Sequence, residues 1–151
     1  MHPRDPDFER RVRDSFARQT LMHTLGATLE RVGAGEVELA LPYRAALTQQ
    51  HGFLHAGVVA AVVDSACGYA ALSLMESGAA VLSVEFKVNL LAPARGARFR
   101  AIGHVVRAGR TLTVVSGELH AYAAPSGGAH EVVAMMTATM MAVRGRPELA
   151  D

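Results

Sequence analysis

A single acidic residue, Asp64, interrupts the most apolar stretch of the sequence. It is the only Asp or Glu between Glu38 and Glu76, and the block 56–71 around it otherwise consists of apolar and small residues. Because burying an unpaired carboxylate costs free energy, such a group is paired, neutralised or used in chemistry. A partly desolvated aspartate is suited to act as a general base or a nucleophile. The structural alternative is that Asp64 caps a helix break or bonds to nearby backbone.

The residues that would share a helical face with Asp64 are all small. Residues three and four apart lie on one face of a helix, and here they are Ala60, Ala61, Cys67 and Gly68. A stripe of small residues lets a second backbone or a thin ligand approach closely. We therefore expect Asp64 to lie beside a narrow channel.

A second group with chemical potential precedes the block. The residues His55, Ala56 and Gly57 open the predicted helix, so free backbone N–H groups point out of its positive end. Such groups can polarise a carbonyl and hold an oxyanion. The alternative is that Gly57 only permits close packing and His55 only caps the helix. His51 lies four residues before His55, but no third ligand has matching spacing, so we expect no metal site.

The helix start and Asp64 lie too far apart to act on one bond within one chain. Nine residues separate His55 from Asp64, a rise of about 13 Å along a helix. If both groups act on one substrate, the second must come from another subunit. We therefore expect a homodimer with two shared sites, formed by antiparallel copies of this helix. The sequence leaves open whether two dimers join as a tetramer.

Hydrophobic periodicity predicts the elements that would position these groups. It indicates a short helix over 7–18, a long helix over 56–75, and six strands over 25–32, 36–41, 82–90, 98–107, 111–122 and 131–143. The long helix is apolar on every side and must be buried on every side. An α+β fold, with an antiparallel sheet of about six strands wrapped around this helix, satisfies that need. We divide the chain into a lead-in (1–22), a main domain (23–144) and a tail (145–151).

The strand after the long helix alternates strictly in sequence. One face is predicted to carry Leu82, Val84, Phe86, Val88 and Leu90, and the other Ser83, Glu85, Lys87 and Asn89. This pattern places Ser83 opposite the apolar face.

Composition excludes several classes of function. The 151 residues, 50% of them hydrophobic, fit one domain, and a net charge of +1 favours neither nucleic acid nor an anionic membrane as partner. The lone cysteine, Cys67, allows no disulfide within the chain, as is usual in a reducing compartment. The charged N-terminus lacks the apolar core of a secretory signal, and the longest apolar run is too short to span a membrane. We therefore expect a cytoplasmic protein.

Three features together resemble the hot-dog-fold thioesterases of the phenylacetate-degradation (PaaI-like) family. They are Gln49, the segment HGFLHAG (51–57) with Asp64 after it, and the segment SVEFKVNLLAPA (83–94), and the resemblance covers about residues 40–143. It implies hydrolysis of an acyl-CoA thioester, with an aryl or medium-chain acyl group, to free acid and CoA. It also implies a homodimer or a dimer of dimers and no cofactor.

The resemblance also implies roles for individual residues. Asp64 matches the catalytic carboxylate, acting as nucleophile or as general base. Ala56 matches the residue, usually glycine, whose N–H polarises the thioester carbonyl. His55 matches the histidine beside the thioester, and Gln49 stands where many members have asparagine. Ser83 matches a position where a hydroxyl helps to hold the attacking water.

The phosphates of CoA require donors, and arginines flank one predicted strand. Arg95 and Arg98 precede or begin it, and Arg107 and Arg110 follow it. We expect Arg107, Gly109 and Arg110 to contact CoA phosphates, since similar turns border CoA in this fold. The alternative is ordinary solvated charge.

Two other functions remain open from sequence. A hot-dog enoyl-CoA hydratase or dehydratase usually pairs its catalytic histidine with a carboxylate on one short segment, whereas Asp64 lies far along the helix. A non-catalytic acyl-CoA binding protein has no need to bury Asp64.

Overall fold

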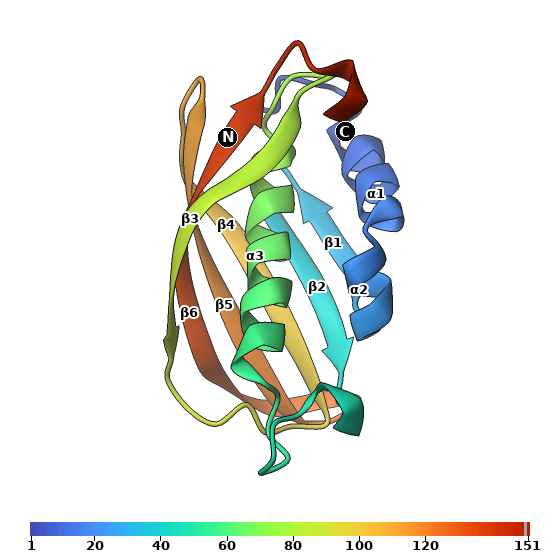
Figure 1. Ribbon diagram of the computed structural model, residues 1–151, viewed down its shortest axis with the longest axis vertical. Coiled ribbons are helices and arrows are strands. Elements are labelled where there is room, and N and C mark those ends of the chain that lie inside the picture. The colour runs from blue at the N-terminus through green and yellow to red at the C-terminus, as the bar shows by residue number, and fades with distance from the viewer. Residues whose placement is uncertain (150) are drawn as a thin grey trace.

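In the computed structural model, which describes residues 1–149 and 151, one antiparallel sheet wraps around a central helix (Figure 1). The helices are α1 (Phe8–Arg18), α2 (Thr20–Leu25) and α3 (Ala56–Leu72), with short 3₁₀ turns at Ala45–Leu47 and Pro147–Leu149. The strands are β1 (Thr28–Gly33), β2 (Glu36–Pro42), β3 (Ala80–Leu90), β4 (Arg98–Ala108), β5 (Leu112–Ala124) and β6 (Gly127–Val143). The predicted α+β architecture is confirmed.

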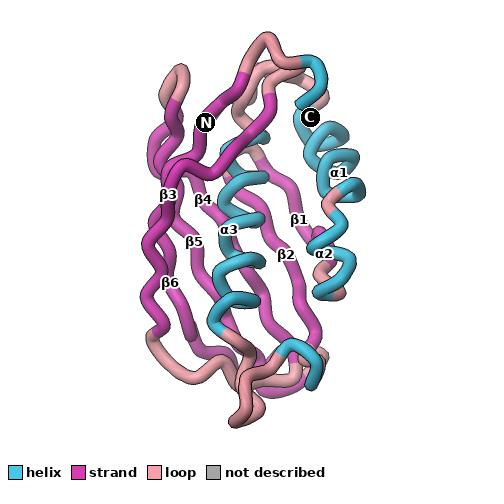
Figure 2. Tube along the Cα trace, viewed as in Figure 1, coloured by secondary structure: helices cyan, strands magenta, loops and turns pink. Residues whose placement is uncertain are grey.

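The strand order places β3 at an edge of the sheet. The six strands follow the order β1-β2-β4-β5-β6-β3, and every neighbouring pair is antiparallel. The helix α3 lies on the concave face, and α1 and α2 lie beside it near β1 (Figure 2). Strand β3 therefore has one neighbour, β6, although β4 follows it in sequence.

Two glycines allow α3 to lie directly on the sheet. Gly103 of β4 and Gly117 of β5 are register partners under the helix. A Cβ at Gly103 would lie 2.3 Å from the Ala66 carbonyl oxygen, and one at Gly117 would lie 2.6 Å from a Val63 methyl. The absence of both side chains makes room for the helix backbone.

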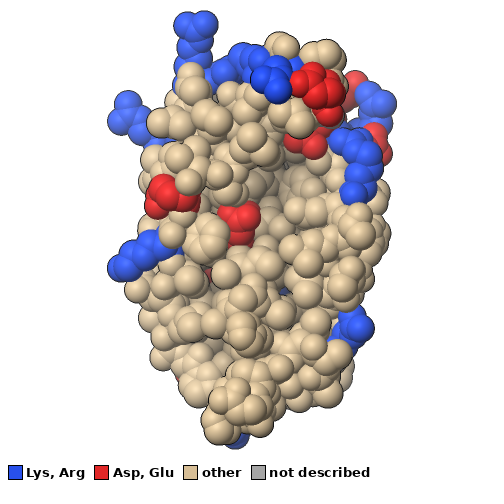
Figure 3. All heavy atoms as spheres, in the orientation of Figure 1, with Lys and Arg blue, Asp and Glu red and all other residues tan. Residues whose placement is uncertain are grey.

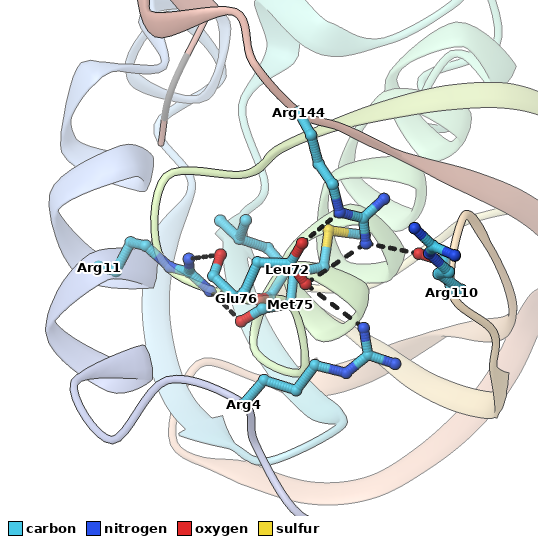
Figure 4. Close-up of polar contacts among 7 residues, drawn as sticks. All are labelled: Arg4, Arg11, Leu72, Met75, Glu76, Arg110 and Arg144. Carbon is cyan, nitrogen blue, oxygen red and sulfur yellow. Dashed lines mark hydrogen bonds and ion pairs between the residues drawn. The ribbon is translucent and has the colours of Figure 1, made fainter.

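An arginine of α1 closes the C-terminal end of α3 (Figure 4). The buried Arg11 guanidinium donates to the carbonyl oxygens of Leu72, at 2.9 Å, and Met75, at 2.7 Å. It also donates to the Glu76 carbonyl and forms an ion pair with Asp5 at 3.4 Å. Leu72 is the last residue of α3, and Met75 and Glu76 lie in the turns that follow it, so Arg11 holds these turns against the helix end.

The Glu76 carboxylate joins three distant segments at the same end. It forms ion pairs with Arg4 and Arg144, and Arg144 also donates to the Arg110 carbonyl oxygen (Figure 4). These partners, chiefly Arg144, lower the pKa of Glu76 to about 2.

Several predicted boundaries differ from the structure. The long helix ends at Leu72 rather than at 75, because the next residues form turns that Arg11 closes. The helix α2 was not predicted, and it delays the first strand to Thr28 because Gly26 ends it in the left-handed conformation. Strand β6 begins at Gly127, where positive φ at Gly127 and Gly128 shapes the β5–β6 connection. In the predicted tail, residue 150 lies outside the described residues.

The prediction that Ser83 faces away from the apolar side of β3 was wrong. A β-bulge between Ser83 and Glu85 shifts the register with β6 by one residue. Ser83 therefore pairs with Met140, which faces α3, and lies on the same side as Phe86 and Val88. Leu82, which precedes Ser83 and the bulge, lies on the side of the sheet opposite to Ser83.

Candidate active site

The carboxylate of Asp64 lies in the middle of α3 and is held by β3. The Ser83 hydroxyl donates a hydrogen bond of 2.8 Å to Asp64 Oδ1. Burial raises the pKa of Asp64, and the Ser83 hydrogen bond offsets part of that rise by favouring the carboxylate. A half-buried carboxylate with one neutral donor and a raised pKa has the character of a general base.

A groove of about 300 Å³ opens beside this carboxylate, between α1, α3 and β3. The face shown in Figure 3 is hollowed, and its charged side chains gather mainly towards the upper end. The groove is lined largely by polar residues: Ser15, Arg18, Gln19, Asp64, Ser65, Gly68, Tyr69, Val81, Ser83 and Asp151. The small residue Gly68 keeps its floor open, because a Cβ there would meet no atom within 4 Å.

The start of α3 leaves one backbone amide free. His55 caps the helix, and its Nδ1 accepts from the Gly57 N–H at 2.9 Å. The Val58 and Val59 N–H groups both bond to the His55 carbonyl. Among the described residues, the Ala56 N–H is therefore the group of the first turn without a partner, and it lies at the positive end of the helix dipole.

The side chain of Gln49 lies near this helix start. Its Oε1 accepts from the His51 N–H within a tight turn, in which Gly52 adopts a positive φ. Gln49 and Ala56 both line a second cavity of about 400 Å³, with Phe53 and mostly apolar neighbours from the 90–94 segment.

The structure thus divides the expected site residues between two cavities. Asp64 and Ser83 line the groove, whereas Gln49 and Ala56 line the second cavity. The described part of the chain brings no residue of one pair into the lining of the other. This separation agrees with the distance of about 13 Å between the ends of the helical segment.

The arginines that flank β4 lie at its opposite ends, and the residues expected at the CoA phosphates all lie at one of them. Arg107, Gly109 and Arg110 surround the β4–β5 turn, beside the Glu76 cluster of Figure 4. Arg95 stacks over the Phe53 ring, 5.1 Å from its centroid, at the helix-start end. Strand β4 is eleven residues long, so about 35 Å separates its two ends.

Other features of the site were missed or left undefined by the sequence. The groove residues Ser15, Arg18 and Gln19 come from the end of α1, which carries no sequence signal of a link to Asp64. Cys67 is buried near Asp64, and burial together with that charge raises the pKa of its thiol to about 12. Its thiolate is therefore not available as a nucleophile.

Two further properties concern only the described residues, 1–149 and 151. They contain no group of three or more His, Cys, Asp or Glu side chains placed to hold a metal ion. None of their helices is long and apolar enough to cross a membrane.

Known proteins share this fold and sequence. A family model described as the thioesterase superfamily matches residues 51–123. A thioesterase family protein from Silicibacter pomeroyi has a crystal structure that superposes with a TM-score of 0.87. It is 57% identical, and the match covers 91% of this chain and 99% of that protein. The PaaI protein from the phenylacetic acid degradation operon of E. coli superposes with a TM-score of 0.81 at 17% identity, over 94% and 97% of the two chains, which shows a shared fold.

A more distant relative also matches this chain in sequence. A protein from Halobacterium salinarum that is named as an esterase is 35% identical over 99 residues. The match covers 62% of this chain and 65% of the relative, less than two thirds of its length.

The sheet wrapped around α3 defines the class as a hot-dog-fold protein, and the solved structures confirm this assignment. The high identity and nearly complete coverage of the Silicibacter pomeroyi protein go further. This chain belongs to the thioesterase superfamily.

Proposed function

We propose that this protein hydrolyses acyl-CoA thioesters, with aryl or medium-chain acyl groups, at two sites shared across a homodimer. The observation that carries the proposal is the division of the expected site residues between two cavities, with Asp64 and Ser83 in one and Gln49 and Ala56 in the other. One cavity holds a carboxylate with a raised pKa, and the other is bordered by a free amide at a helix start. Superfamily membership supports thioester hydrolysis as the reaction.

The exposed edge of the sheet supports dimerisation. Strand β3 leaves large apolar side chains in solvent, with Val84 and Leu90 each 54% exposed and Phe86 44% exposed. An unpaired edge strand with such side chains is a template for pairing with another chain. In the proposed dimer two β3 strands meet antiparallel, and the start of α3 in one subunit approaches Asp64 of the other.

The chemistry follows from the two halves of the site. The Ala56 N–H of the partner subunit donates a hydrogen bond to the thioester carbonyl oxygen and stabilises the negative charge that forms on it. As a general base, Asp64 takes a proton from water while the water oxygen attacks the carbonyl carbon. The carbon–sulfur bond then breaks, and the CoA thiolate leaves and takes up the proton. As a nucleophile, Asp64 would instead attack the carbonyl carbon and displace the CoA thiolate, and water would then hydrolyse the resulting anhydride to the free acid and the Asp64 carboxylate.

Neighbouring groups prepare these steps. Ser83 holds the Asp64 carboxylate, and the Gln49 amide is placed near the helix start to orient the water or the thioester. Gly57 fixes the His55 ring through its N–H. Arg107, Gly109 and Arg110 are our proposed contacts for the CoA phosphates. We also propose a cytoplasmic location, where acyl-CoA is available.

The first experiment measures free-thiol release from a panel of aryl- and fatty acyl-CoAs. Wild type is compared with Asp64→Asn and with a matched control, Asp14→Asn, which removes an exposed carboxylate of α1. We expect Asp64→Asn to lose at least about a hundredfold in kcat/KM, because a positioned acid–base group contributes that much. The control should retain wild-type activity.

Stability and assembly are measured in parallel. Because burial raises the pKa of Asp64, its charge opposes folding at neutral pH, so Asp64→Asn should unfold no earlier than wild type. Acyl-CoA binding without thiol release in wild type would overturn the hydrolase proposal in favour of a binding protein.

A further inference from the structure

The side chain of Asp151 lies inside the groove beside Asp64 and joins two of its walls. On α1, the Ser15 hydroxyl donates to Asp151 Oδ1 at 2.6 Å, and the Arg18 guanidinium forms an ion pair with the same oxygen at 3.5 Å. On β3, the Val81 N–H donates to Asp151 Oδ2 at 3.3 Å. Asp151 and Asp64 both line the groove, and only 19% of the Asp151 side chain is exposed. A carboxylate of the chain itself therefore fills part of the space beside the proposed base.

The chain after β6 turns back towards this position. Gly145 adopts a positive φ of 68°, a conformation that favours glycine, and the 3₁₀ turn Pro147–Leu149 follows it. The Leu149 N–H closes this turn by donating to the Arg146 carbonyl oxygen at 2.9 Å. Figure 1 shows the segment running from the end of β6 towards α1. The turn therefore directs the chain to the groove rather than away from the molecule.

The contacts of Asp151 hold a segment that has little else to anchor it. Residues 145–149 are all exposed, so they bury little apolar surface against the rest of the molecule. The Arg18 side chain is itself 59% exposed, which leaves its ion pair with Asp151 screened by solvent. The closed arrangement is therefore stabilised by a few polar contacts, and a ligand that enters the groove can displace Asp151.

We propose that Asp151 is an autoinhibitory strap, which closes the groove beside Asp64 and must be released before an acyl-CoA substrate can enter. The inference rests on the proposed function, because it requires the substrate to reach Asp64 through this groove. The strap lowers the fraction of molecules that are able to bind, so it raises the apparent Kd and KM by the reciprocal of that fraction. It leaves kcat unchanged, because Asp151 is already displaced once the substrate is bound.

The test removes the contacts of the strap and measures substrate binding. Asp151→Ala removes the whole carboxylate, and Asp151→Asn keeps its shape without the charge. With hexanoyl-CoA and phenylacetyl-CoA as substrates, we expect Asp151→Ala to lower KM by about threefold to tenfold, the effect of one or two net hydrogen bonds, with kcat unchanged. The Kd values of the thioethers hexyl-CoA and phenacyl-CoA, which have no thioester bond to break, should fall by the same factor in calorimetry. Asp151→Asn should lie between Asp151→Ala and wild type.

The matched control is Glu148→Ala, which removes another carboxylate of the same segment. Glu148 pairs with Arg146 and lies outside the groove. Because this variant changes the net charge by the same amount as Asp151→Ala, it shows how far the loss of a negative charge alone favours the anionic CoA. Its KM and Kd values should stay close to those of wild type. Thermal unfolding of all variants shows that the constants are measured on folded protein.

A salt series gives a second readout. Added salt screens the exposed ion pair between Arg18 and Asp151, so it should bring the ratio of the wild-type Kd to the Asp151→Ala Kd closer to one. The effect of salt on CoA itself cancels in this ratio. A ratio that grows with salt would contradict a strap held by this ion pair.

The possible outcomes separate this inference from the function on which it rests. Hydrolysis with unchanged or weaker binding in Asp151→Ala overturns the strap alone, and so does an equal gain in Glu148→Ala. Tighter thioether binding by Asp151→Ala, without thiol release from either substrate, would support the strap and overturn the hydrolase. If no variant binds the thioethers or releases thiol, both the function and the inference fail.

Discussion

At the scale of single residues, the pairing of Asp64 with Ser83 determines when the carboxylate is charged. Burial favours the neutral acid, and the hydrogen bond from Ser83 favours the carboxylate. The sequence identified Asp64 because it is an isolated acid in an apolar block. It could not place Ser83 beside Asp64, because one extra residue in a bulge reverses the side on which Ser83 lies.

Removing the Ser83 hydroxyl should move the acidic limb of the pH–rate profile. In Ser83→Ala burial acts without compensation, so the pKa of Asp64 rises further and the active carboxylate is lost at higher pH. Relative to wild type, the kcat/KM of the variant should therefore fall more at pH values below the raised pKa than at pH values above it. The measurement is kcat/KM from pH 4 to 9, over the range in which both proteins stay folded.

Ser83→Thr is the control for this prediction, because it keeps a hydroxyl at the same position. Its acidic limb should stay close to that of wild type. An unchanged or lowered limb in Ser83→Ala would show that the hydroxyl does not stabilise the charged form of Asp64.

At the scale of elements, the close contact between α3 and the sheet depends on missing side chains. A methyl group at Gly103 would meet the backbone of Ala66, which cannot move without the whole helix. We expect Gly103→Ala to destabilise the fold by about 1–3 kcal/mol, the usual cost of overpacking. Urea unfolding measures this cost.

Gly33→Ala is the comparison, because a Cβ there would meet its nearest atom at an ordinary contact distance of 3.6 Å and its φ is not positive. It should change stability little. Equal effects of the two variants would contradict the argument that backbone contact at Gly103 is limiting.

Periodicity predicted the long elements because each shows one face over many residues. The apolar block gave α3, and alternation gave most of β4 and β5. The helix α2 has only six residues, too few to show a period. The polar end of the groove was not predicted either, because Ser15 and Tyr69 are brought together by packing between elements distant in sequence.

At the scale of the whole molecule, the proposed site requires two chains. Sequence spacing and the two separate cavities lead to the same expectation, but neither contains the partner itself. A complementation experiment tests it directly. Ala56→Pro removes the free N–H at the first position of α3, where proline is tolerated well. Asp64→Asn removes the carboxylate.

Each variant alone should be inactive, whereas a refolded equimolar mixture should recover about a quarter of the wild-type activity. Half of the dimers are then mixed, and each mixed dimer contains one complete site. The control mixes Asp64→Asn with the double variant, which offers no complete site. Mixed dimers that form but remain inactive would place both groups in the site of a single chain.

The position of β3 in the sheet has a consequence for how the protein is made. β3 is synthesised before β4, yet within the sheet it bonds only to β6, the last strand of the chain. While the ribosome produces residues 91–126, the strand that carries Ser83 has no sheet partner. The hydroxyl partner of Asp64 and the proposed dimer edge are therefore completed only after β6 has emerged. Premature pairing of β3 with another nascent chain is therefore prevented only if β3 stays covered until β6 has emerged.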